Sequence, residues 1–139
     1  RRERAWVEVN LAAIAHNIRQ IKSLLSSRTA LMSVIKADAY GHGATTVAQT
    51  VLQAGADWLG VATIPEGIEL RETGIDAPIL VLGANHTPEQ MRAIAHWRLQ
   101  PTICTPKQAL VFSETLAELE EKRLPVHLKL DTGMSRLGT

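Results

Sequence analysis

Short apolar runs alternate with longer helical patterns along this chain, and this alternation constrains the fold more than any other feature. The apolar runs centre near residues 34, 60, 80, 103 and 128, and roughly 20–26 residues separate one centre from the next. A helical pattern lies between each pair of neighbouring runs. This rhythm is typical of parallel βα units, in which each strand is followed by a helix that returns the chain to the same end of the sheet.

The residue pattern also predicts where each element begins and ends. We expect strands at 5–9, 31–36, 58–62, 78–82, 102–104 and 126–130, and helices at 11–25, 45–53, 65–72, 88–97 and 107–121. Asn10, Thr87 and Thr105 are good N-cap residues for three of these helices. Periodicity alone leaves two folds open, since a doubly wound sheet and a βα barrel share this rhythm.

Composition limits the classes of function. The chain has 139 residues, 45% hydrophobic and 21% charged, as expected for an ordinary globular domain. The net charge of +1 gives no electrostatic case for nucleic acid or for an acidic membrane surface. No signal-peptide pattern and no run of 18 apolar residues occurs, which favours the cytoplasm. Cys104 lies in an apolar run and is expected to be a buried thiol, and the histidines lack the spacing of metal ligands.

A lysine at the end of an apolar run is the first candidate for chemistry. Residues 34–43 read VIKADAYGHG, so that Lys36 ends a predicted strand and a turn with a tyrosine and two glycines follows. A partly desolvated lysine amine loses its proton readily and can form a Schiff base with a carbonyl cofactor. Tyr40 and the backbone N–H groups of the turn suit a phosphate. The competing interpretation is a lysine at a strand end followed by an ordinary glycine turn.

A second candidate segment follows the last predicted strand. Residues 125–139 read PVHLKLDTGMSRLGT and place Arg136 in a polar loop. A guanidinium offers a fork of donors that suits a planar anion. In a βα barrel the chemistry gathers at the carboxyl ends of the strands. Lys36 ends one predicted strand, the loop at residues 83–84 follows another and Arg136 lies just past a third, so we expect all three to face one rim.

Both segments resemble motifs of alanine racemases. The first is similar to the pyridoxal-phosphate attachment motif and the second to the family's Asp-Thr-Gly-Met-x-Arg-Leu-Gly loop, and the resemblance extends over essentially the whole chain. It implies an α/β fold, the N-terminal part of a (β/α)8 barrel of the TIM type. A full barrel needs about 250 residues. Residues 1–139 supply about five βα units, so we expect a truncated barrel domain without the family's C-terminal β-rich domain.

The resemblance also implies roles for individual residues. Lys36 would carry pyridoxal 5'-phosphate and exchange the α-proton with D-alanine, and Tyr40 would donate its hydroxyl to the phosphate. Leu82 would pack against the pyridine ring, and Arg136 would lie beside the phenolic oxygen of the cofactor and the substrate carboxylate. The implied reaction interconverts L- and D-alanine and supplies D-alanine for peptidoglycan.

The resemblance further implies a homodimer, in which a tyrosine of the other subunit serves as the second base. Tyr40 is the single tyrosine of this chain, and the motif assigns it to the phosphate. The isolated chain is therefore not expected to racemise alanine efficiently.

Lys129 and Ser135 raise separate questions. Lys129 alternates with Leu128 and Leu130 and so faces the opposite side of the strand, where an unpaired buried ammonium would be costly. Some family members carry a carbamate on the matching lysine, which makes Lys129 a candidate for carbamylation, and a pair with Asp131 or another acid is the alternative. Ser135 stands where many relatives have glycine, in a loop that requires a flexible backbone.

Other functions remain open from the sequence. A related racemase acting on serine or another small amino acid would share both motifs. A non-catalytic single-barrel protein that binds pyridoxal phosphate would share the lysine-bearing strand, but the loop with Arg136 argues against it. A module that completes a barrel with another chain is a further alternative. Asp38 and His42 are expected to support the lysine turn, His42 in a structural role.

Overall fold

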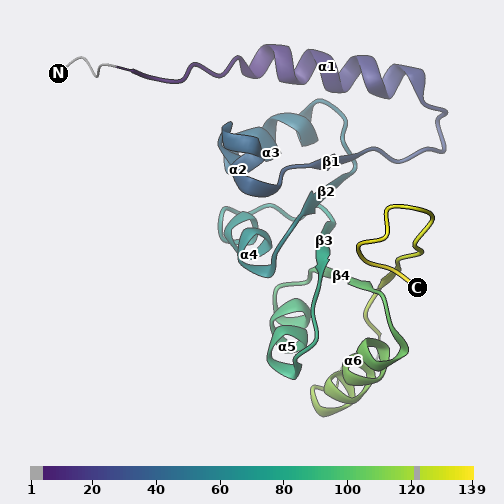
Figure 1. Ribbon diagram of the computed structural model, residues 1–139. Helices are drawn as coiled ribbons and strands as arrows, with labels where there is room; N and C mark the ends of the chain where they lie inside the picture. Colours follow the sequence, from purple (N-terminus) through teal and green to yellow (C-terminus); the bar gives the residue numbers. More distant parts are fainter. Residues whose placement is uncertain (1–4, 121–122) are drawn as a thin grey trace.

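The computed structural model describes residues 5–120 and 123–139 (Figure 1). In this part of the chain the strands are β1 (Met32–Val34), β2 (Trp58–Val61), β3 (Ile79–Ala84), β4 (Gln100–Ile103) and β5 (His127–Leu128). The helices are α1 (Leu11–Leu24), α2 (Lys36–Gly41), α3 (Ala44–Gln53), α4 (Ile64–Glu72), α5 (Pro88–His96) and α6 (Pro106–Glu118). None of these helices is long and apolar enough to cross a membrane.

The strands form one parallel sheet in the order β1-β2-β3-β4-β5. A doubly wound sheet reverses its strand order part-way and carries helices on both faces. Here each strand pairs with the next one along the chain, and α3 to α6 lie along one side of the sheet (Figure 1). The order therefore decides between the two folds, and the prediction of a partial βα barrel is confirmed.

A contact between β2 and β5 shows that the sheet curls. The rings of Trp58 and His127 meet edge to face, with their centroids 5.5 Å apart. Two strands separate β2 from β5, so in a flat sheet they would lie roughly 14 Å apart at the usual spacing between strands. The imidazole of His127 also shares a 3.0 Å hydrogen bond with the side chain of Gln100. These side chains fill the concave face, which is the inside of a barrel.

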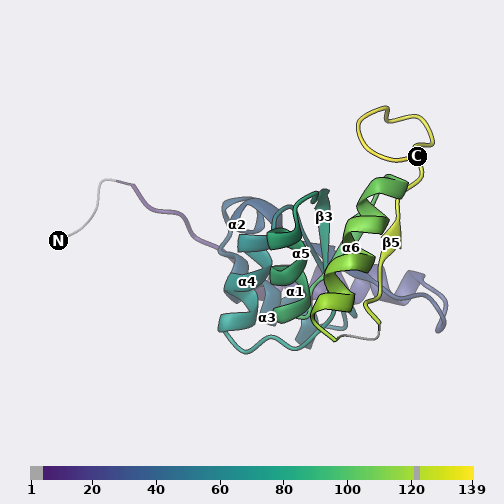
Figure 2. The same cartoon turned by 90° about the horizontal axis from the view of Figure 1, so that it is seen from below.

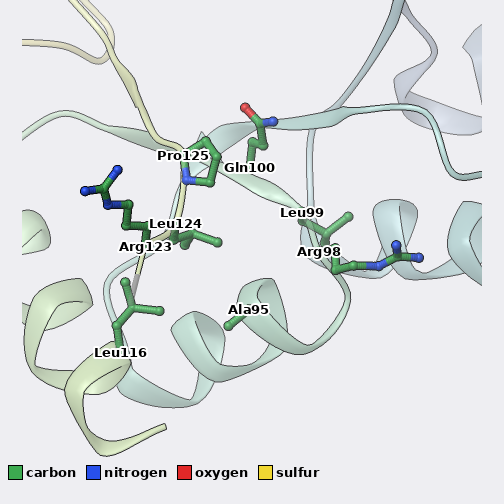
Figure 3. Close-up of a pocket in the computed structure, with 8 residues that line it drawn as sticks. All are labelled: Ala95, Arg98, Leu99, Gln100, Leu116, Arg123, Leu124 and Pro125. Carbon is green, nitrogen blue, oxygen red and sulfur yellow. The ribbon is translucent and has the colours of Figure 1, made fainter. Parts of the chain in front are cut away.

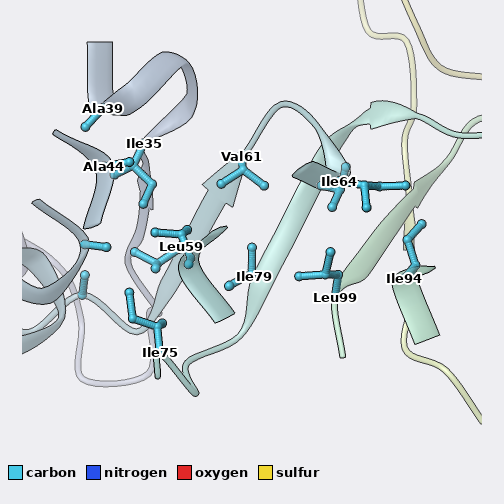
Figure 4. Close-up of a cluster of buried hydrophobic side chains, with 14 of the residues drawn as sticks. Ile35, Ala39, Ala44, Leu59, Val61, Ile64, Ile75, Ile79, Ile94 and Leu99 are labelled. Carbon is cyan, nitrogen blue, oxygen red and sulfur yellow. The ribbon is translucent and has the colours of Figure 1, made fainter. Parts of the chain in front are cut away.

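The core lies between the convex face of the sheet and the helices (Figure 4). Leu59, Val61 and Ile79 alternate along their strands with residues of the concave face and are almost fully buried. Full burial of such a side chain stabilises the fold by about 1.5–3 kcal/mol. Ile35 and Ala39 belong to the same cluster, so the segment around Lys36 is anchored in the core on both sides of the lysine.

The predicted strand at residues 5–9 is wrong. The segment forms no strand, and the side chains of Trp6 and Val7 are 69% and 80% exposed. An apolar run becomes a strand only where a neighbouring strand accepts its hydrogen bonds, and the described chain offers no such neighbour there. The other predicted elements form within a few residues of their expected bounds. The predicted end of the last helix, residue 121, lies outside the described residues, and α6 ends at Glu118.

Arg71 joins three segments at the amino rim of the sheet. Its guanidinium donates to the carbonyl groups of Trp97, Ile75, Ala77 and Arg98 at 2.6–3.0 Å. Burial lowers the pKa of Arg71, and the cationic Arg98 lowers it further. Arg71 thereby donates to carbonyl groups in the loops after α4 and α5. Because these loops lead into β3 and β4, the same side chain holds them together.

We predict that Arg71→Lys lowers the free energy of unfolding by about 2–3 kcal/mol, because an ammonium cannot serve four carbonyl groups in one plane. Urea unfolding of the intact protein measures the change. Arg92→Lys is the matched control. Among the described residues Arg92 forms only an exposed 3.8 Å pair with Glu118, so this change should cost less than about 0.5 kcal/mol. Equal losses of unfolding free energy in the two variants would contradict the role of Arg71 in holding these loops together.

Candidate functional site

Lys36 lies at the carboxyl edge of the sheet, directly after β1. The preceding residue, Ile35, is 4% exposed, and its N–H donates to the carbonyl of Gly60 at 2.8 Å. This bond extends the pairing of β1 with β2 up to the lysine. Lys36 itself is partly exposed. The candidate amine is therefore carried by a fixed backbone, which is what a covalent cofactor site needs.

The turn that follows Lys36 is left-handed, a feature that the sequence did not predict. Ala37, Asp38, Ala39 and Tyr40 have φ of 51–55° and ψ of 39–52°. Each non-glycine residue in this conformation costs about 1–2 kcal/mol, so four in a row cost on the order of 4–8 kcal/mol. Strain of this size persists only where surrounding interactions fix the backbone, and it is concentrated at functional sites.

Hydrogen bonds hold this turn in place. The carboxylate of Asp38 accepts from the N–H of Ala44 at 2.7 Å, at the start of α3. The imidazole Nδ1 of His42 lies 2.9 Å from the carbonyl of Ala39. The N–H of Ala37 donates to Oε1 of Glu66 at 3.1 Å, which ties the turn to α4. The supporting roles expected for Asp38 and His42 are thus observed, whereas Glu66 was missed.

Tyr40 and Leu82 occupy different surroundings. Tyr40 is the last residue of the left-handed turn that follows Lys36, and its side chain is 60% exposed. Leu82 lies on β3 and is half-buried. A Cβ placed on Gly60 would lie 3.4 Å from Val34 and 3.6 Å from Leu82, so these two side chains flank Gly60 on the concave face. Leu82 and the strand that carries Lys36 therefore border one apolar surface.

The loop of Arg136 is closed at its base by backbone hydrogen bonds. The N–H of Asp131 donates to the carbonyl of Thr139, and the N–H of Thr139 donates to the carbonyl of Lys129, at 3.1 and 3.0 Å. Inside the loop, Oδ1 of Asp131 accepts from the N–H groups of Ser135 and Gly133, each at 3.0 Å. These bonds hold the pKa of Asp131 below its usual value, with the bond from Ser135 contributing most.

Ser135 adopts φ of 58° in this loop, which is the left-handed region that glycine tolerates best. The expectation that this position requires unusual backbone freedom is met. Lys129 is partly buried, and within the described residues its ammonium forms no ion pair. The carboxylate of Asp131 bonds to the loop backbone instead, so the expected alternative of a Lys129–Asp131 pair is not observed.

The predicted site residues share one rim but do not yet form a closed pocket. In Figure 2, α2 lies level with the upper end of β3, and the C-terminal loop lies above that end. Lys36 and Tyr40 are brought together on one turn, whereas Arg136 follows β5 at the far edge of the sheet. The described residues contain no group of three or more histidine, cysteine, aspartate or glutamate side chains placed to hold a metal ion.

Two surface grooves lie apart from Lys36 and Arg136. One, of about 390 Å³, lies at the amino ends of β4 and β5, on the rim opposite Lys36. The guanidinium groups of Arg98 and Arg123 point away from each other there, so the groove does not gather positive charge (Figure 3). A second groove, of about 570 Å³, lies on the carboxyl rim between the first turns of α4 and α5 and includes the predicted loop at residues 83–84. Neither groove is lined by Lys36 or Arg136.

Comparison with known proteins identifies the family. The model for the N-terminal domain of alanine racemase matches residues 9–139. The chain belongs to this family. An alanine racemase from Nostoc sp. is 68% identical over 138 residues, which are 99% of this chain and 36% of that relative. The crystal structure of alanine racemase from E. faecalis has a TM-score of 0.88 and 35% identity, covering 94% of this chain and 35% of the other.

A histidine racemase shares the same architecture. The enzyme from Leuconostoc mesenteroides subsp. sake has a TM-score of 0.83 and 33% identity, covering 92% of this chain and 34% of the other. This chain spans about a third of the length of the curated alanine racemases that it matches.

We predict that order in the Arg136 loop depends on ionised Asp131. Because the pKa of Asp131 is lowered in the folded chain, the stabilisation is complete above the ordinary carboxyl pKa of about 3.9 and is lost as pH falls through the lowered value. NMR titration of the Gly133 and Ser135 amide protons measures this. Asp131→Asn keeps an accepting oxygen and should abolish the titration. A midpoint above the ordinary value would contradict the geometry.

Proposed function

We propose that this chain supplies the lysine-bearing part of a pyridoxal-phosphate-dependent amino-acid racemase, which interconverts L- and D-alanine. The observation that carries the proposal is the left-handed turn after β1. It places Lys36 and Tyr40 at the carboxyl rim of a curled parallel sheet, in a chain that belongs to the alanine racemase N-terminal domain family. D-alanine supply for peptidoglycan is the corresponding physiological role.

The residues at this rim fit pyridoxal phosphate by their chemistry. Lys36 offers a primary amine for the aldehyde, and Tyr40 offers a phenolic hydroxyl for the phosphate from the same turn. Val34 and Leu82 offer apolar side chains on the concave face for an aromatic ring. When bound, the cofactor would supply the electron sink that makes the substrate α-proton acidic.

The residues of this chain would then perform three tasks. Lys36 would hold the cofactor and, in its neutral form, accept or return the α-proton on one face of the substrate. Tyr40 would orient the phosphate by donating its hydroxyl hydrogen. Arg136 would face the substrate carboxylate and the phenolic oxygen of the cofactor, because its guanidinium fork matches a planar anion. Carbamylation of Lys129 would place an anion beside Arg136.

The remaining parts of the activity are proposed to come from outside residues 1–139. These are the other barrel strands, a C-terminal β-rich domain and a tyrosine from the second subunit of a homodimer. Because the single tyrosine of this chain is Tyr40, a base for the opposite substrate face would have to come from elsewhere. We propose a cytoplasmic location for the enzyme and alanine as its small-molecule substrate.

A different amino acid is the second candidate substrate. A protein named histidine racemase shares the fold of this chain at 33% identity, so this third of the architecture is compatible with more than one side chain. Assay of the intact protein with a panel of L-amino acids separates the candidates. If the protein racemises alanine much faster than serine or histidine, the result supports the proposal. A clear preference for another amino acid would contradict alanine as the substrate.

We predict that borohydride reduction in the presence of pyridoxal phosphate traps one dominant covalent adduct in the intact protein, at Lys36. The physical reason is that Lys36 is partly desolvated, whereas a lysine such as Lys107 is exposed and keeps its hydration. Peptide mass mapping locates the adduct. Lys36→Arg should remove it and abolish racemisation.

Lys107→Arg is the control for this experiment, because Lys107 is exposed on the first turn of α6. This variant should retain the adduct and the activity. Adducts scattered over surface lysines, with no preference for Lys36, would contradict the proposed cofactor site.

A further inference from the structure

Three of the helices that pack on the sheet begin with a capping box. Each has a threonine N-cap and a glutamate or glutamine three residues later, and each of these pairs bonds reciprocally. The pairs are Thr63–Glu66 on α4, Thr87–Gln90 on α5 and Thr105–Gln108 on α6. In every case one side-chain oxygen of the glutamate or glutamine accepts from two successive backbone N–H groups, the N-cap residue and the residue before it. This arrangement satisfies donors that a helix start leaves free.

In two of the three helices the second polar atom of this side chain reaches the loop after another strand. Nε2 of Gln108 donates to the carbonyl of Asn85 at 2.9 Å, just after β3. Oε1 of Glu66 accepts from the N–H of Ala37 at 3.1 Å, just after β1. The type of side chain matches its partner, because a carbonyl requires a donor and an N–H requires an acceptor. Glutamate is therefore suited to position 66, as glutamine is to position 108.

The N–H that Glu66 binds belongs to the residue directly after Lys36. Ala37 is also the first of the four left-handed residues, with φ of 51°. A hydrogen bond at this point fixes the direction in which the backbone leaves the lysine. The other oxygen of the same carboxylate is held by Ala62 and Thr63 at 2.7 and 3.3 Å, so the carboxylate is itself fixed.

We propose that Glu66 is a positioning residue for Lys36. Its carboxylate couples the start of α4 to the strained turn and so holds the lysine backbone in the conformation that receives the cofactor. This inference rests on the proposed function for its consequence in catalysis. The claim about the turn itself rests on the hydrogen bonds alone.

Glu66→Gln tests the proposal sharply. A glutamine at this position keeps the cap on α4 through its carbonyl oxygen, as Gln90 and Gln108 do on their helices. Its amide nitrogen then faces the N–H of Ala37, and two donors cannot bond. In the intact protein we expect amide exchange at Ala37 to accelerate and the rate of covalent trapping of pyridoxal phosphate at Lys36 to fall by about tenfold, because a hydrogen bond to a charged group is lost.

Two control variants separate positioning from helix capping. Thr63→Ala removes the hydroxyl half of the same capping box but leaves the bond between Glu66 and Ala37, so it should weaken α4 without slowing trapping at Lys36. Gln90→Glu makes the reverse amide-to-acid change on α5, whose capping side chain bonds only within its own cap among the described residues, and should also leave trapping unchanged.

The outcomes distinguish the inference from the proposed function. Slower trapping and faster exchange in Glu66→Gln alone support the positioning role. Wild-type exchange at Ala37 in Glu66→Gln, or equal slowing of trapping in Thr63→Ala, overturns it and leaves Glu66 a simple helix cap. If the wild-type protein traps no cofactor at Lys36, the proposed function fails, and amide exchange at Ala37 still decides whether Glu66 holds the turn.

Discussion

Hydrogen bonds between capping side chains and backbone groups of neighbouring loops hold the carboxyl rim of this sheet. In a parallel sheet the carboxyl ends of all strands lie at this rim. Each helix that follows a strand begins with backbone N–H groups that have no partner within the helix. Glu66 and Gln108 satisfy those groups and also reach sideways to another loop. Glu66 thereby joins the lysine turn to the start of α4, and Gln108 joins the loop after β3 to the start of α6.

The lysine turn is where this support matters most. Four left-handed residues without glycine are unfavourable, and an isolated peptide of this sequence would adopt other conformations. Burial of Ile35 and Ala39 in the core and the carboxylates of Asp38 and Glu66 compensate for that cost. The left-handed conformation lets the chain reverse within a few residues of β1 and still enter α3. Lys36 therefore lies at the edge of the sheet, and the buried residues and hydrogen bonds on either side of it fix its backbone.

The sequence predicted the order of the elements and the position of Lys36 well, because apolar periodicity and the Thr-Pro helix starts are local signals. It failed at residues 5–9, where the described part of the chain offers the apolar run no neighbouring strand, since strand formation depends on a partner and not on propensity alone. The left-handed turn was also missed, because alanine, aspartate and tyrosine give no sign of positive φ. Glu66 was missed altogether, because its bond to Ala37 joins residues 29 positions apart.

The most direct test of this account is a crystal structure of the intact protein with pyridoxal phosphate and reduced with borohydride. We predict continuous density from the Lys36 amine to the cofactor, positive φ from Ala37 to Tyr40, and the carboxylate of Glu66 on the Ala37 N–H. A right-handed or extended turn at these residues, or cofactor attached to a different lysine, would contradict the claim that this turn builds the site.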